Sequence, residues 1–210
     1  MDRRTFEQSD PEFGDLISGL DSPYKIQEFL DSIPYNTTKR TLSPMLVYRE
    51  RMAHCMDGGM FAAAALRNLG YPPLITDLSA ENDDDHIIAV FREGKCWGAV
   101  AKSNTTVLRF REPVYRSLRE LAMSYFDFYY NLNGQKTLRS YSRKVDLSRF
   151  DDRHWETTED DLEYIGDYIS TVRHYPLITP QQTASLNDVP RYLFDAGFSG
   201  ADIDGLFKPE

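Results

Sequence analysis

The chain has 210 residues, few cysteines and no long hydrophobic run. Its two cysteines, Cys55 and Cys96, are too few for a disulfide framework and lack zinc-type partners. The longest apolar run, residues 60–66, is far too short to cross a bilayer. No run of Lys or Arg exceeds two residues, and 33 acidic against 24 basic side chains give a net charge of −9. We therefore expect neither a nucleic-acid partner nor a membrane partner.

The length and the residue composition of the chain are typical of a folded protein in a reducing compartment. A length of 210 residues is enough for one domain with a proper core, and 41% apolar residues with 13% aromatics exclude a disordered chain. The first residues, MDRRTFEQSDPEFG, are charged and contain no apolar segment typical of a secretory signal. We expect a single domain over residues 1–210 and a cytoplasmic setting.

Residues 51–70, RMAHCMDGGMFAAAALRNLG, predict one buried helix with Cys55 at its entrance. Gly70 suits the left-handed position that ends a helix. Gly58 and Gly59 favour a crowded first turn, where another backbone or a substrate comes close. At a helix N-terminus the dipole favours negative charge, so we expect a lowered pKa for the Cys55 thiol.

The remaining pattern predicts an α+β fold, because helices come first, then a hairpin-based sheet, then helices. Ser–Pro pairs at residues 22–23 and 43–44 open two early helices. Strands are predicted at 74–78, 86–91, 96–101 and 137–142, and helices at 113–131 and from Thr157 or Thr158 onward.

A thiol nucleophile needs a base within hydrogen-bond reach, and the chain has four histidines. His54 neighbours Cys55 and points about 100° away on a helix start. His154 and His174 lie in the acidic C-terminal part. His86 opens the central strand directly after a polar loop, which is where a catalytic base is expected. An alternative for His86 is a strand-end histidine bonded only to backbone groups.

The predicted strand register shows which of the two cysteines can lie on the same side as His86. With Glu93 and Gly94 as the turn, Phe91 faces Cys96 and His86 faces Ala101. Cys96 then points away from the His86 face and is predicted to be structural.

These features resemble the transglutaminase-like branch of the papain-type fold, in particular an uncharacterised bacterial group. The matching positions are Cys55, Leu66, Arg67, Gly70, Pro72, His86 and Trp97, within the segments CMDGGMFAAAALRNLGYPPLI, DDDHIIAVF and GAVAKSN. The resemblance implies a central helix bearing Cys55, packed on a small antiparallel sheet bearing His86. It implies a core at residues 20–105 and a family-specific, mostly helical extension at residues 106–210.

The third member of the implied triad is open. The family places an aspartate where the register puts Ala101. The substitutes that remain are Ser103, on the same face, and Asn104, which a bulge would bring round. Asp84 or Asp85 would approach His86 locally.

The resemblance implies acyl transfer, or amide or peptide hydrolysis, through a thioester on Cys55. His86 would be the base, Asn104 or Ser103 the orienting group, and backbone N–H groups the oxyanion site. The substrate would contain a peptide or amide bond, and no cofactor or metal is implied. Two alternatives remain: a metal site at Asp83, Asp84, Asp85 and His86, and a catalytically inactive binding or scaffold module of the same fold.

Overall fold

A computed structural model describes residues 10–209 and has an α+β fold. Seven antiparallel strands form one sheet in the order β4-β3-β2-β1-β5-β7, with β6 also pairing with β1. The strands are β1 (Leu74–Ala80), β2 (His86–Glu93), β3 (Cys96–Val100), β4 (Arg111–Tyr115), β5 (Leu138–Ser142), β6 (Val145–Asp146) and β7 (His174–Pro176). The sheet is thus larger than the small sheet that the sequence predicted.

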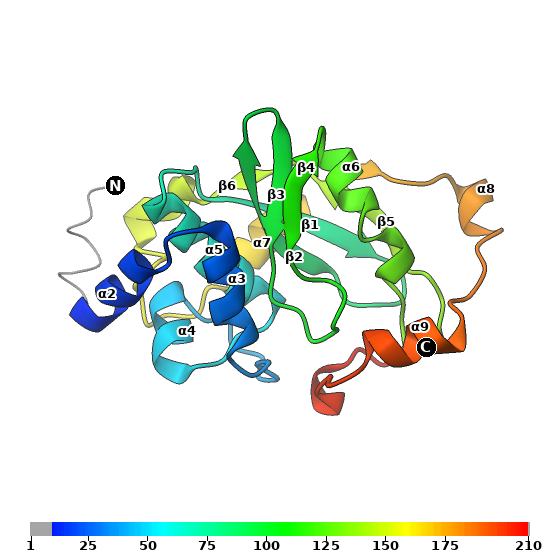
Figure 1. Cartoon of the computed structure of the whole chain (residues 1–210), viewed down its shortest axis with the longest axis horizontal. Coiled ribbons are helices and arrows are strands. Elements are labelled where there is room, and N and C mark those ends of the chain that lie inside the picture. Colours follow the sequence, from blue (N-terminus) through cyan, green and yellow to red (C-terminus); the bar gives the residue numbers. More distant parts are fainter. Residues whose placement is uncertain (1–9, 210) are drawn as a thin grey trace.

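Helices cover both faces of the sheet. On one side lie α2 (Pro11–Gly19), α3 (Pro23–Asp31), α4 (Pro44–Glu50), α5 (Cys55–Asn68) and α7 (Glu163–Thr171). On the other lie α6 (Leu118–Met123) and the 3-10 turn η1 (Phe126–Phe128). The remaining elements are η2 (Leu147–Arg153), α8 (Pro180–Thr183), α9 (Arg191–Gly197) and η3 (Ile203–Gly205). Figure 1 shows α2 to α5 gathered beside the sheet, and α8 and α9 beyond its opposite edge.

The core has two parts, one on each face of β2. Ile87, Ala89 and Phe91 pack toward α5, whereas Ile88 and Val90 pack toward the α6 side. This alternation follows from the period of two in a strand. A strand segment covered on both faces carries apolar residues on both, as the sequence of residues 86–91 indicated.

The helix predicted within residues 51–70 has Cys55 at its entrance, as expected, and residues 51–54 lie before it. Arg51 adopts a left-handed backbone conformation that ends α4, and the cap from His54 starts α5 at Cys55. Ala53 then pairs with Tyr35 in a short bridge. Gly70 has φ +92° and closes the far end of α5, as expected.

The C-terminal half contributes to the same sheet as the first half. Strands β4 to β7 come from residues 111–176, within the part expected to be mostly helical. The helix predicted over residues 113–131 is wrong at both ends, because β4 occupies its start and α6 spans only Leu118–Met123, followed by the separate turn η1. The helix predicted from Thr157 or Thr158 begins instead at Glu163. No helix in residues 10–209 is long and apolar enough to cross a membrane.

Candidate active site

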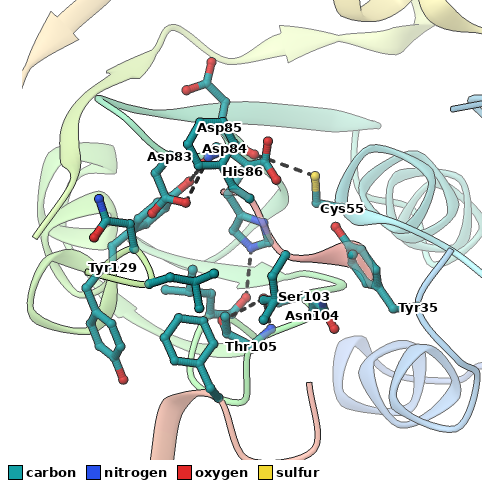
Figure 2. A pocket seen from close by; sticks show the side chains of 18 residues that line it. Tyr35, Cys55, Asp83, Asp84, Asp85, His86, Ser103, Asn104, Thr105 and Tyr129 are labelled. Atoms are coloured by element: carbon teal, nitrogen blue, oxygen red, sulfur yellow. Dashed lines mark hydrogen bonds between the residues drawn. The ribbon is translucent and has the colours of Figure 1, made fainter. Parts of the chain in front are cut away.

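One cavity brings the four predicted site residues together. Cys55, His86, Ser103 and Asn104 all line it, and its space, open mouth included, is about 520 Å³. Figure 2 shows the thiol and the imidazole bordering this cavity, which we call the thiol cavity. Cys55 comes from α5 and His86 from the start of β2, so the packing of this helix on this strand sets their relative position.

Cys55 is held at the first residue of α5 by a reciprocal cap. The Nδ1 atom of His54 accepts the backbone N–H groups of Met56 and Asp57, at 3.1 and 3.3 Å. The carboxylate of Asp57 accepts the backbone N–H groups of His54 and Leu42, at 3.0 and 2.7 Å. His54 therefore caps the helix. Because its Nδ1 lone pair already accepts these backbone N–H groups, His54 is not available as a base for the Cys55 thiol.

The glycines after Cys55 are crowded by the protein itself. A Cβ atom on Gly58 would lie 2.2 Å from Cβ of Lys102, and one on Gly59 would lie 2.7 Å from Cγ2 of Ile87. The close approach expected from the sequence is therefore made by β2 and by the segment after β3. It lets α5 lie directly on the sheet.

The Cys55 thiol is neutral in this environment. Its Sγ lies 3.8 Å from the carbonyl oxygen of Asp85, which can only accept, so the S–H group donates. Burial raises the pKa of Cys55 to about 12, and the negative charges of Asp84 and Asp57 add to the effect. The backbone N–H of Ile87 acts in the opposite direction. The expected lowering of this pKa by the helix dipole is wrong, because desolvation outweighs it.

His86 is buried and held in one tautomer. Its Nε2 atom lies 2.9 Å from the carbonyl oxygen of Leu108, so Nε2 carries the proton that is donated. Burial lowers the pKa of His86 to about 4, which leaves the ring neutral at pH 7. The edges of Tyr125 and Tyr129 enclose the ring. Nδ1 then keeps its lone pair and can accept a proton. Among the described residues, no hydrogen bond joins the thiol of Cys55 to this ring.

The register of the hairpin differs by two residues from the predicted one. Glu93 pairs with Cys96, and Ala89 pairs with Val100. The turn lies at residues 94–95, because Gly94 supplies the positive φ of +57°. Continuing the register places position 103, not Ala101, across from His86. Because the register differs from the predicted one by an even number of residues, Cys96 still lies on the sheet face opposite to the face that carries His86, as predicted.

Among the described residues, no hydrogen bond joins His86 to either predicted orienting residue. Ser103 bonds through its Oγ to the hydroxyl and the backbone N–H of Thr105, both at 3.0 Å. The amide of Asn104 pairs with the backbone N–H and C=O of Asp202, both at 2.8 Å. The orienting contact comes from the Leu108 carbonyl instead. Sequence reasoning missed it because every residue has a carbonyl, so residue type carries no information about it.

Neither a protein-family model nor a curated protein matches this chain. The functional assignment therefore rests on the geometry and chemistry of the thiol cavity.

Tyr35 is a site residue that sequence reasoning missed. It lines the thiol cavity, and its bridge with Ala53 places it beside the start of α5. Burial raises the pKa of Tyr35 well above its ordinary value, while the neighbouring backbone of Cys55 acts in the opposite direction. The phenol is thus a neutral O–H donor next to the thiol.

Three consecutive aspartates form the loop wall of the cavity. Asp83 accepts a hydrogen bond from the Thr137 hydroxyl at 2.7 Å, and burial raises the pKa of Asp83 to about 6. The carboxylate of Asp85 accepts the backbone N–H of Ala80 at 2.8 Å. Burial also raises the pKa of Asp84. Within residues 10–209, no three His, Cys, Asp or Glu side chains are grouped so that they could hold a metal ion.

The C-terminal segment lies across the mouth of the cavity. Leu206 and Phe207 line it, and the faint red ribbon of this segment passes beside the labelled side chains in Figure 2. Asn104 anchors the segment through Asp202, and the hydroxyl of Thr106 bonds to the Ser199 carbonyl at 2.8 Å. Nothing in the sequence pattern indicated this return of the chain to the site.

The other two histidines lie outside the cavity. His154 is exposed and ends η2 in a left-handed conformation. The Nε2 atom of His174 lies 3.0 Å from Oδ2 of Asp77, and its Nδ1 lies 2.9 Å from the Val172 carbonyl.

Proposed function

We propose that this chain is a thiol-dependent acyl-transfer enzyme of the papain-type, transglutaminase-like kind, which cleaves or exchanges an amide bond. Cys55 is the nucleophile and His86 the base. The observation that carries the proposal is the pairing of a thiol at the first residue of a buried helix with a neutral imidazole on the same cavity. The Leu108 carbonyl fixes that imidazole so that its unprotonated nitrogen is available.

The proposed first step starts from two neutral groups. The sulfur of Cys55 bonds to the substrate carbonyl carbon while the thiol proton passes to Nδ1 of His86. The phenol O–H of Tyr35 donates to the oxygen that becomes negative. The C–N bond then breaks, and the imidazolium of His86 gives its proton to the leaving amine.

The second step releases the acyl group from the thioester. Water, or an amine, attacks the thioester carbon and gives a proton to His86. The C–S bond breaks, and His86 returns that proton to the sulfur. With water the reaction is hydrolysis, and with an amine it is transfer.

An activated ester tests the nucleophile and the base without knowledge of the natural substrate. In a Cys96→Ser background, we expect p-nitrophenyl acetate to add one acetyl group, which intact-mass and peptide mapping assign to Cys55. His86→Gln keeps an N–H donor for the Leu108 carbonyl but removes the base, so acylation should slow about 100-fold or more. Acylation that is unchanged in His86→Gln would contradict the proposal.

The alternative is a binding or scaffold module of the same fold. The observation that favours it is the neutral thiol, whose S–H group donates to a backbone carbonyl and whose pKa is raised to about 12. Under this alternative, Cys55 stays unacylated by esters and thioesters and reacts with thiol reagents only after urea unfolding. That outcome would contradict the enzyme proposal and support a binding or scaffold module.

A further inference from the structure

The surface around Cys55 is hollowed in three places, and carboxylates line all of them. The first hollow is the thiol cavity, with Asp83, Asp84 and Asp85. The second lies on the outer side of Cys55 and adds Asp204. Among the described residues, no Lys or Arg lines any of the three. Within residues 10–209, no Lys or Arg that lines these hollows therefore offsets the negative charge of their carboxylates, although His174 contacts Asp77.

The third hollow, which we call the acidic hollow, lies between the start of α5, β1, the loop before β2, and α7. Asp77, Asp85, Glu163 and Asp167 line it, and its space, open mouth included, is about 680 Å³. Asp85 also lines the other two hollows, so the three meet at this residue.

Asp77 is the innermost carboxylate of the acidic hollow and is incompletely bonded. Its residue is 5% exposed. Oδ2 is bonded to His174, but Oδ1 is buried without any hydrogen-bond partner. A buried acceptor that lacks a donor is costly, and native proteins seldom keep one without a reason. The donor that Oδ1 lacks is the first indication of a ligand.

The walls of the acidic hollow are apolar. Met56, Ile87 and Ile169 line it together with the carboxylates. A ligand that satisfies both kinds of surface has an aliphatic stem and a positively charged end with N–H donors. An ammonium or guanidinium group on a short alkyl chain has this chemistry.

The acidic hollow is close to the reacting sulfur. Met56 directly follows Cys55 in α5, and Asp77 is near enough that its negative charge helps to raise the pKa of the Cys55 thiol. Because Asp85 lines both this hollow and the thiol cavity, a group bound in the hollow would lie beside a molecule bound in the thiol cavity.

We propose that the acidic hollow binds the cationic end of a substrate, an ammonium or guanidinium group on an aliphatic stem, with Oδ1 of Asp77 as its innermost acceptor. The proposal rests on the proposed acyl transfer and names its substrate class. The cation belongs either to the acyl substrate or to the amine that accepts the acyl group, and the experiment separates these sources.

The acyl arm compares two p-nitrophenyl esters, of Nα-acetyl-arginine and of Nα-acetyl-citrulline. The two side chains have the same shape but differ in charge. If the cation is on the acyl substrate, the arginine ester acylates Cys55 about tenfold faster or more. Asp77→Asn should remove this preference, because its amide is neutral and can still form a hydrogen bond with His174. Glu112→Gln removes an exposed carboxylate outside all three hollows and should leave the preference unchanged.

The acceptor arm follows the loss of the acetyl group from acetylated Cys55. If the cation is on the acceptor, agmatine accelerates this loss and appears as acetyl-agmatine, and Asp77→Asn removes the acceleration. If neither arm shows a dependence on charge that Asp77→Asn removes, the cation proposal is overturned while the acyl transfer itself stands. Circular dichroism melts confirm that each variant is folded.

A third measurement keeps the two proposals separable. Agmatine should raise the melting temperature of the wild-type protein and of Glu112→Gln, but not of Asp77→Asn. If no ester acylates Cys55 and this shift is still found, the acyl-transfer proposal fails and the cation site remains. If the shift is absent as well, both fail.

Discussion

At the scale of single residues, the site consists of groups that burial keeps neutral. A thiolate–imidazolium pair needs an environment that stabilises both charges, and here desolvation opposes both. The pKa of Cys55 is raised to about 12 and that of His86 is lowered to about 4. Under the proposed mechanism, proton transfer therefore accompanies the attack on the substrate instead of preceding it. The proposal then requires charge stabilisation in the transition state, and it assigns this role to the Tyr35 phenol.

The buried histidine has a consequence for stability against pH. In the unfolded chain an ordinary histidine has a pKa of about 6.5, whereas the pKa of His86 in the fold is about 4. Between these values the unfolded state binds more protons, so stability falls as the pH decreases from 6.5 toward 4. From pH 7.5 to 4.5 the wild-type free energy of unfolding should drop about 2–3 kcal/mol more than that of His86→Gln.

Urea unfolding at the two pH values measures this difference. Titration of every other group is common to both proteins and cancels in the comparison. Equal losses in the two proteins would mean that His86 is protonated within the fold near pH 6, which is incompatible with its burial.

Sequence reasoning selected Cys55 and His86, which line one cavity in the structure, but not the backbone and phenol groups beside them. Cys55 and His86 could be selected as candidate site residues because the start of a helix and the start of a strand can be recognised in the sequence. The Leu108 carbonyl and the Tyr35 phenol could not, because their roles arise from a loop and a bridge that join distant segments. The choice of Ser103 and Asn104 depended on a hairpin turn placed one residue too early, which moves the register by two.

At the scale of elements, α5 determines the site because it lies unusually close to the sheet. Its first residue presents the thiol, and its glycines allow β2 and Lys102 to approach. The sequence predicted the helix, its burial and its end at Gly70. It also predicted Cys55 at the helix entrance, but not the cap from His54 or the bridge at Ala53 that precede this start.

The closeness of this packing can be tested with two helical glycines. Gly58→Ala would place a Cβ atom 2.2 Å from Cβ of Lys102, so we expect a loss of about 1–3 kcal/mol in the free energy of unfolding. Gly166→Ala in α7 meets no atom within 4 Å and should gain about 0.5–1 kcal/mol from helix propensity. Urea unfolding at pH 7 gives both values, and a Gly58→Ala protein as stable as the wild type would show that α5 is not held at this distance.

At the scale of the whole molecule, the second half of the chain completes the fold and then returns to the site. Strands β4 to β7 extend the sheet, and the segment after α9 crosses the thiol cavity. A motif-based interpretation treats residues 106–210 as an addition to a core, because the motifs end near residue 105. In three dimensions the two halves share one sheet and one cavity, and pairing between distant strands is not visible in local patterns.

Removal of the C-terminal segment should open the thiol cavity. A chain that ends at Phe198 lacks Leu206 and Phe207, which line the cavity, but keeps the contacts of Tyr130 with Phe194 and Phe198. We expect iodoacetamide to alkylate Cys55 several-fold faster in this shortened protein at pH 8, because access increases while the thiol keeps its neighbours on α5 and β2. Mass spectrometry of the two cysteine peptides gives both rates in one sample.

Cys96 provides the internal control for this measurement. It lies at the start of β3 and lines neither the thiol cavity nor the two hollows beside it, so its rate should not change. A full-length variant with Leu206→Ser and Phe207→Ser should show part of the same increase, which separates loss of the covering side chains from shortening of the chain. If the ratio of the two alkylation rates is the same in all three proteins, the segment does not restrict access to Cys55.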